Sequence, residues 1–341
     1  MLVCAFRDSI PGMKIFVFEF ITGGGLAGVS LPPGLAHEGD LMIHALIRDL
    51  IQAGYRDLVT LRDKRLPAIK LPVKSFPVSQ SMSEDCQALM SSADATFLIA
   101  PETGGVLLQL TRQAGDSGCL LMGCDAHSVE LAAGKRDCCE HLRCHGIAVP
   151  DSYSIDDMRI IPDRPLVLKP DDGVGGEACY LFDDRVSLRR WLDRQEDCRT
   201  WLIQPYIPGE AASLNLFCQN NGVLVLAVNR QQFEFREGKG VLSGVVVNEF
   251  AGRRDEFRGL ARKITDAVPG LRGFVGVDLI LTDAGPVVIE INPRLTTSYA
   301  GLHESLGYNP AELLFQSQES AIITERLFKT AVPVTLQLSV H

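Results

Sequence analysis

The chain has 341 residues, of which 46% are hydrophobic and 22% charged, an ordinary globular composition that is too long for one small core. The formal net charge of −9 argues against a nucleic-acid-binding protein, because such proteins usually carry a basic face. The ten cysteines include no CxxC pair, and no apolar run resembles a membrane span or a signal-peptide core, so we expect a cytoplasmic protein with reduced thiols and no membrane partner.

The first third of the chain alternates predicted strands with predicted helices. Residues 1–12 precede Met13 and are interpreted as an extension that reflects the choice of start codon. This alternation predicts a doubly wound α/β domain with parallel strands over residues 13–125. The strands are expected at 14–20, 58–61, 95–100 and 118–122, and the helices at 37–53, 83–91 and 102–114.

Two more domains are predicted, over residues 126–206 and 207–330, and they give the rest of the chain a mixed α+β character. Helices at 128–146 and 185–194 and strands at 166–169, 178–182 and 201–204 are expected in the first. In the second we expect strands at 214–219, 223–229 and 244–249, helices at 255–267 and 309–316, and a hairpin at 276–292.

The most informative segment is this hairpin. Two apolar, β-branched runs flank the sequence Thr-Asp-Ala-Gly-Pro, which is a turn signal. If the turn centres on Ala284, Asp278 lies directly opposite Glu290 on one face of the hairpin, and Asn292 shares that face. Two carboxylates and an amide carbonyl suit Mg²⁺, which prefers oxygen ligands. Taken alone, the pattern also fits a hairpin with an exposed acidic face.

Three basic residues have surroundings that favour phosphate binding. Lys169 ends a predicted strand, and the glycine-rich turn Gly173–Gly176 after it would close over phosphates with its backbone N–H groups. Lys135 lies early in a predicted helix, where a bound phosphate would favour both the lysine and the helix dipole. Arg294 follows the hairpin and would hold phosphoryl or carboxylate oxygens. An ordinary hairpin turn and solvated surface lysines are the competing interpretations.

Residues 201–210 predict a strand that runs into an extended segment bracketed by prolines. Such a segment would offer backbone groups to an adenine edge and apolar side chains to the ring, through Gln204, Tyr206 and Ile207. It would also serve as a linker between two lobes, and the two roles are compatible.

The order of these features resembles the ATP-grasp family over roughly residues 125–316, with a preceding α/β domain. The resemblance implies a two-lobed ATP-grasp domain that binds ATP, and one or two Mg²⁺ ions, or Mn²⁺, held by Asp278, Glu290 and Asn292. Glu210 comes directly after Gly209, which departs from the family's placement of a ribose-binding glutamate. The ATP-binding residues that the resemblance implies are Lys135, Lys169, Gly173, Gly175, Gly176, Gln204, Tyr206, Ile207 and Glu210, and the catalytic residues are Lys169, Arg230 and Arg294.

Three motifs, KPDDGVGGE, AVNRQQ and EINPRLTTSYAG, look like the tyramine–glutamate ligase branch of this family. That likeness implies an ADP-forming carbon–nitrogen ligase that joins tyramine to the γ-carboxylate of glutamate through an acyl phosphate. The product would serve the synthesis of a methanofuran-like one-carbon carrier. The expected partners are therefore small molecules, not nucleic acid, and a homo-oligomer is compatible with the sequence.

Three alternatives remain open at this point. An ATP-grasp ligase for another amino acid or amine, such as a dipeptide or peptide-tailing ligase, fits the same motifs. A nucleotide-sensing binding protein that has lost turnover would also retain them. An NAD-dependent oxidoreductase is a distant third: Gly23–Gly28 matches G-x-G-x-x-G, but Val-Ser-Leu-Pro-Pro-Gly separates it from the next predicted helix.

Overall fold

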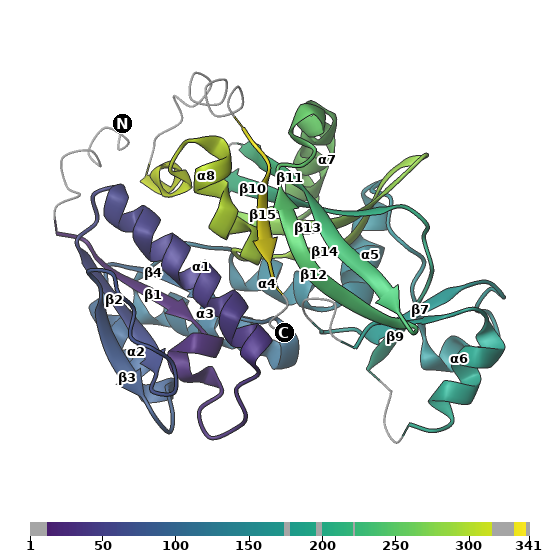
Figure 1. Ribbon diagram of the computed structural model, residues 1–341, viewed down its shortest axis with the longest axis horizontal. Helices are drawn as coiled ribbons and strands as arrows, with labels where there is room; N and C mark the ends of the chain where they lie inside the picture. Colours follow the sequence, from purple (N-terminus) through teal and green to yellow (C-terminus); the bar gives the residue numbers. More distant parts are fainter. Residues whose placement is uncertain (1–11, 174–177, 196–199, 221, 316–330, 339–341) are drawn as a thin grey trace.

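The computed structural model describes residues 12–173, 178–195, 200–220, 222–315 and 331–338, which form a five-stranded sheet and a ten-stranded sheet (Figure 1). The five-stranded sheet lies at one end of the molecule, and a small lobe around α6 lies at the other. None of the helices in these ranges combines the length and apolar character that a membrane-crossing segment needs.

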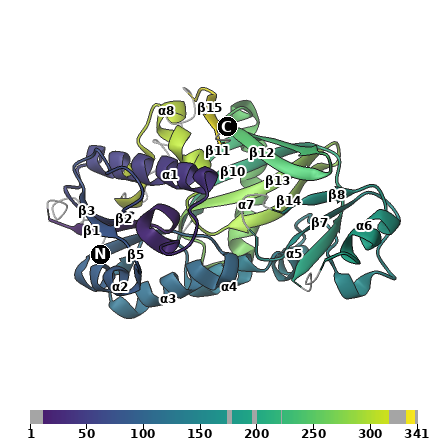
Figure 2. The same ribbon diagram turned by 60° about the horizontal axis from the view of Figure 1, so that its bottom comes forward.

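The N-terminal sheet has the strand order β3-β2-β1-β4-β5, and its paired strands are parallel. Alternation along β1 sends Ile15 and Val17 into the core beneath α1, and Phe16 and Phe18 into the core beneath α2 and α3. Helices therefore cover both faces (Figure 2), and the predicted doubly wound domain is confirmed. Its elements are β1 (Lys14–Glu19), α1 (Pro33–Gln52), β2 (Asp57–Asp63), β3 (Lys74–Val78), α2 (Ser83–Ser92), β4 (Ala95–Ile99), α3 (Val106–Ser117) and β5 (Leu120–Leu121).

The second sheet is antiparallel along the path β14-β13-β10-β11-β12-β8-β7-β9-β6, with β15 paired to β12. Its two halves join at one registered pair in the described chain, Lys239 of β12 opposite Tyr180 of β8. Strands β6 to β9 with α6 thus form a small lobe, and the remaining strands form a large lobe. Their elements are α4 (Ala126–Ala133), α5 (Lys135–Cys144), β6 (Tyr153–Ser154), β7 (Leu166–Pro170), β8 (Tyr180–Phe182), α6 (Arg185–Leu192), β9 (Trp201–Pro205), β10 (Glu210–Gln219), β11 (Gly222–Arg236), β12 (Lys239–Val247), α7 (Arg254–Ala267), β13 (Gly273–Thr282), β14 (Gly285–Asn292), α8 (Leu302–Leu306) and β15 (Val334–Gln337).

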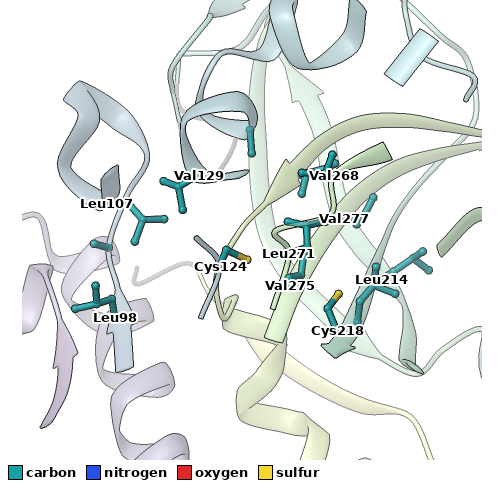
Figure 3. Close-up of a cluster of buried hydrophobic side chains, with 14 of the residues drawn as sticks. Leu98, Leu107, Cys124, Val129, Leu214, Cys218, Val268, Leu271, Val275 and Val277 are labelled. Carbon is teal, nitrogen blue, oxygen red and sulfur yellow. The ribbon is translucent and has the colours of Figure 1, made fainter. Parts of the chain in front are cut away.

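One hydrophobic core runs from the N-terminal domain into the large lobe. Figure 3 shows Leu98 and Leu107 on the domain side, Cys124 between the two, and Val275 and Leu214 on the lobe side. All five are buried. Because burial of this kind is the main stabilising contribution to a fold, the two parts are held in a fixed relation. Any cavity between them is therefore preformed.

The predicted helix 128–146 is wrong in one respect, because it is broken at Gly134 into α4 and α5. The backbone N–H groups of Lys135 and Arg136 donate to Asp171, to its carbonyl at 3.2 Å and its carboxylate at 2.9 Å. The contact supplies partners for the first N–H groups of α5, which have none within the helix. As a result Lys135 begins a helix beside β7 instead of continuing one.

Several short elements escaped prediction, namely β3, β6, α8 and β15, and residues 310–315 form a 3₁₀ helix where an α-helix was expected. Strand β3 contains Pro77, which is tolerated because β3 is an edge strand. Strand β11 extends to Arg236, well past the predicted end at residue 229.

Gly39 lets α1 approach the end of β1 closely. A Cβ at this position would lie 2.5 Å from Glu19 Oε2 and 2.9 Å from Thr22 Cγ2. We therefore expect Gly39→Ala to lower the free energy of unfolding by about 1–2 kcal/mol, because overpacking outweighs the better helix propensity of alanine. Thermal denaturation would measure this. Gly34→Ala is the matched control, because Gly34 lies in the same helix with no atom within 4 Å of its added Cβ; equal melting temperatures would contradict the prediction.

Candidate active site

The β13–β14 hairpin brings its acidic residues together. Asp278 pairs with Glu290, and Gly276 pairs with Asn292, so the predicted opposition of the two carboxylates is confirmed. The predicted turn centre is wrong, because Thr282 pairs with Gly285 and the turn has two residues. A β-bulge nevertheless brings the two carboxylates opposite each other. Leu279 pairs with Val288 and Asp278 pairs with Glu290, so Ile289 of β14 is the extra residue that has no partner on β13.

Asp278 lies among polar side chains from two other strands, β11 and β14. Gln231 of β11 donates from Nε2 to Oδ1 at 2.9 Å, and Asn292 donates from Nδ2 to Oδ2 at 3.4 Å. Burial, together with the facing charge of Glu290, raises the pKa of Asp278 well above its usual range. Gln231 was not predicted, because it lies on a strand 47 residues away in the sequence.

Two buried lysines face the other carboxylate. Lys135 Nζ lies 3.4 Å from Glu290 Oε2 and also donates to the carbonyls of Asp171, at 3.4 Å, and Gly173. Burial opposes ionisation of Glu290, but the charges of Lys135 and Lys169 prevail and hold its pKa below the ordinary value. Burial lowers the pKa of Lys169, although the charge of Glu290 opposes that shift.

A cavity of about 170 Å³, here called the lobe cavity, lies between the small and large lobes. Its polar end holds the two lysines and two carboxylates just described. Its other end is apolar and includes Tyr206, Phe233 and Phe235, and the ring of Phe235 contacts each of the other two edge to face. The predicted residues that line it are Lys135, Lys169, Gly173, Gln204, Tyr206, Ile207, Asp278 and Glu290.

Other predicted residues lie elsewhere. The guanidinium of Arg230 lies 2.9 Å from Glu210 and 3.8 Å from Glu249, and it stacks over Phe250. Neither Arg230 nor Glu210 is among the residues that line the lobe cavity; Ala211 lines it instead. The structure thus does not bring these two residues to the site. This agrees with the position of Glu210 in the sequence, which departs from the family's placement of a ribose-binding glutamate. Gly175 and Gly176 lie outside the described residues.

Arg294 forms an ion pair with a residue of the N-terminal domain. Its Nη2 lies 3.0 Å from Oε2 of Glu102, which follows β4, and the two side chains are 12% and 7% exposed. Burial opposes the charge of Arg294, but Glu102 prevails and raises its pKa. Arg294 lines a second cavity, of about 450 Å³, here called the interdomain cavity. The two cavities share Asp278 and Glu290, so the carboxylates lie at their junction.

The residues at this junction fit a divalent cation. Within the described ranges no group of three or more His, Cys, Asp and Glu side chains is placed to hold a metal, so the candidate donors are two carboxylates and the amide of Asn292. Glu290 has two lysines nearby, whereas Asp278 accepts hydrogen bonds from the amides of Gln231 and Asn292 and faces the charge of Glu290. A cation that prefers oxygen ligands and retains open positions, such as Mg²⁺, suits this donor set.

Family comparisons agree with this geometry. A model of the ATP-grasp domain matches residues 132–298, and a model of the pre-ATP-grasp domain matches residues 56–129. The chain belongs to the ATP-grasp family. These matches fall on the two-lobed sheet and on the N-terminal sheet, in the order that the sequence resemblance implies.

Two curated relatives of this ATP-grasp chain are tyramine–L-glutamate ligases. That of Methanocaldococcus jannaschii is 26% identical over 313 residues, which are 89% of this chain and 88% of the relative. That of Methanocaldococcus fervens is 29% identical over 324 residues, or 91% and 96%. In structure, the chain is similar to an ATP-grasp superfamily protein from Archaeoglobus fulgidus, with a TM-score of 0.73 and 22% identity over 96% of this chain and 92% of that one.

The oxidoreductase alternative finds no support. Ile21–Gly25 forms a turn of π-helix, not the start of the helix that a dinucleotide-binding motif requires. Gly24 has φ of +93°, and a Cβ there would lie 2.5 Å from Val78, so this glycine serves tight packing.

Proposed function

We propose that this chain is an ADP-forming ligase that joins an amine to a carboxylate, with tyramine and the γ-carboxylate of glutamate as its substrates. The observation that carries the proposal is the junction of the two cavities. There two carboxylates, an amide and two buried lysines converge between a cavity with an apolar end and a larger cavity at the N-terminal domain. The two tyramine–L-glutamate ligase relatives support the choice of substrates.

The lobe cavity is the proposed ATP site. Tyr206, Phe233 and Phe235 would pack against the base, since aromatic side chains stack favourably on planar rings. Lys135 and Lys169 would neutralise phosphate oxygens at the polar end. Asp278, Glu290 and Asn292 would hold Mg²⁺, which when bound neutralises phosphate charge and orients the transferring phosphoryl group.

The proposed reaction has two steps. The γ-phosphoryl group of ATP passes to a carboxylate oxygen, which gives ADP and an acyl phosphate. The amine nitrogen then attacks the acyl carbon, the carbon–oxygen bond to phosphate breaks, and the nitrogen loses a proton, leaving an amide and phosphate. Arg294, fixed by Glu102, would stabilise negative charge on the phosphoryl group and on the tetrahedral intermediate.

An assay of ADP release with a panel of amines and carboxylates tests this proposal. We expect ADP in quantity only when tyramine and glutamate are both present, with one amide formed per ADP, because the acyl phosphate needs both substrates to turn over. Mass spectrometry would identify the amide. Faster turnover with two amino acids would instead favour a dipeptide ligase, and nucleotide binding without ADP release under any condition would favour a sensor protein.

A further inference from the structure

Strand β11 brings an amide side chain to the junction of the two cavities. Gln231 is half-buried and lines both the lobe cavity and the interdomain cavity, as Asp278 and Glu290 do. It shares a face of β11 with Phe233 and Phe235, which line the lobe cavity. The amide thus lies between the apolar end and the charged end of that cavity. Burial of such a group is costly unless it has a hydrogen-bond partner.

Asp278 is that partner. Gln231 donates from Nε2 to Oδ1 of Asp278 at 2.9 Å, which is the usual length of an N–H···O hydrogen bond. Asn292 also donates to Asp278, from Nδ2 to Oδ2, but its distance of 3.4 Å exceeds the usual range of about 2.7–3.2 Å. Of these two amides, Gln231 therefore makes the better hydrogen bond to the carboxylate.

Gln231 and Asn292 differ in their relation to a cation. Asn292 is itself a proposed metal ligand, and an amide binds a cation through its oxygen. Gln231 faces Asp278 with its amide nitrogen, which carries two donors and no acceptor. This end of the side chain orients a carboxylate but does not bind a metal. Gln231 thus complements the proposed ligands without being one of them.

The hydrogen bond from Gln231 restricts how the carboxylate of Asp278 turns. The torsion angle that turns an aspartate carboxylate has broad minima, so the carboxylate oxygens need a hydrogen-bond partner to be well fixed. Donation by Gln231 occupies one of about four acceptor positions, and the others stay open to a cation. Partners of this kind orient metal ligands in proteins and contribute to the affinity for the metal.

The strand that carries Gln231 is itself held by buried polar contacts. Ser213 of β10 pairs with Asp278 in the sheet, and its hydroxyl accepts from Nδ2 of Asn229 at 3.1 Å. Asn229 is completely buried and also donates to Oδ1 of Asn215, likewise in β10, at 2.8 Å. Because Asn229 lies two residues before Gln231 on the same face of β11, these bonds hold β11 beside β10 close to the site. The support for Gln231 is therefore preorganised.

We propose that Gln231 is a positioning residue of the metal site, whose amide orients the carboxylate of Asp278 for a divalent cation such as Mg²⁺. Gln231 acts through Asp278 and binds neither the metal, the nucleotide nor the two substrates. The inference rests on the proposed ligase function and its metal ligands, and it adds the residue that orients one of them. Loss of such a partner typically lowers metal affinity by about ten- to a hundredfold.

Titration of the protein–ADP complex with MnCl₂ tests this role, with free Mn²⁺ followed by electron paramagnetic resonance. Gln231→Met keeps a similar volume but removes the donor, so we expect Mn²⁺ to bind on the order of tenfold more weakly. The affinity for ADP in EDTA, measured by calorimetry, should equal that of the wild type. Gln231→Leu removes the same donor with a different shape and should give the same two results.

Gln232→Met is the matched control. It makes the same change one residue further along β11, where alternation turns the side chain to the opposite face, and Gln232 is not among the described residues that line either cavity. Its affinities for Mn²⁺ and ADP should equal those of the wild type. Unchanged Mn²⁺ affinity in the Gln231 variants would overturn the positioning role. An equal fall in their affinity for metal-free ADP would overturn it too, because it would indicate contact with the nucleotide itself.

Steady-state kinetics separate this inference from the proposed function. If the wild type joins tyramine to glutamate, Gln231→Met should raise the MgCl₂ concentration that gives half the maximal rate by about tenfold and leave the KM values for tyramine and glutamate unchanged. A raised KM for either substrate with an unchanged dependence on MgCl₂, or no binding of Mn²⁺ to the wild-type ADP complex, would overturn the inference. If Mn²⁺ binding depends on Gln231 but no amide forms from tyramine and glutamate, the positioning role stands and the proposed reaction fails.

Discussion

Asp278→Asn is expected to reduce ADP release by at least about a hundredfold while leaving the protein folded. The substitution removes one of the two carboxylates at the junction of the cavities, and a metal at such a site contributes several kcal/mol of transition-state stabilisation. The loss of activity should not be accompanied by a lower melting temperature. Asp278 and Glu290 face each other in a buried setting, so removal of one charge relieves repulsion, and the melting temperature without metal should stay the same or rise.

Two measurements check this expectation, steady-state ADP release and thermal denaturation with and without MgCl₂ and ATP. Asp283→Asn is the matched control, since it makes the same chemical change at the exposed tip of the same hairpin and should resemble the wild type. Glu290→Gln should behave like Asp278→Asn in the activity assay. Normal turnover in either variant would contradict the assignment of these side chains as metal ligands.

Lys169→Met is expected to weaken ATP binding on the order of a hundredfold. Lys169 is buried and lines the lobe cavity, and the described residues give its ammonium group no hydrogen bond. A buried charge is costly unless it is well paired, so the phosphates of ATP would add the hydrogen-bond acceptors that the described residues do not give this ammonium group. Without nucleotide, the variant should keep most of its stability, because relief of the cost of burying the ammonium group offsets the loss of its attraction to Glu290.

Isothermal calorimetry with ATP or ADP would measure the effect. Lys263→Met, at an exposed position of α7, is the control for the loss of one positive charge. Lys135 is tied to two carbonyl groups and to Glu290, so its replacement would disturb neighbouring structure as well as phosphate binding, and Lys169 gives the cleaner test. Unchanged ATP affinity in Lys169→Met would remove its proposed role with phosphate.

Local patterns in the sequence were sufficient for much of the fold. The alternation of predicted strands and helices over residues 13–125 identified the doubly wound domain, and β1 is apolar on both faces, as a strand covered by helices on both sides must be. The hairpin was visible because its two strands are neighbours in the chain. By contrast, the break at Gly134 depends on Asp171, which is 35 residues from its partner Arg136, and no local pattern reports such a contact.

In the candidate active site, too, contacts between residues that are distant in the sequence could not be predicted. Patterns within single segments predicted Lys169, Asp278 and Glu290 as site residues, and all three line the lobe cavity. Gln231 and Glu102 were missed, because each acts on a residue from a distant strand or from another domain. Polar residues within long apolar strands, such as Gln231 in β11, are the one signal in the sequence that could have identified such partners.

The bulge in β14 changes which residues of the hairpin face the lobe cavity. Ile289 and Glu290 are adjacent in the chain, yet both line the lobe cavity, which strict alternation would forbid. The position of Glu290 opposite Asp278 therefore depends on the bulge at Ile289 and not on the identity of the exposed tip residue Asp283, which precedes Glu290 by seven positions. Evolution can alter the composition of that tip without moving the two acids, whereas a regular strand that paired Ile289 with Asp278 would turn Glu290 to the opposite surface of the sheet.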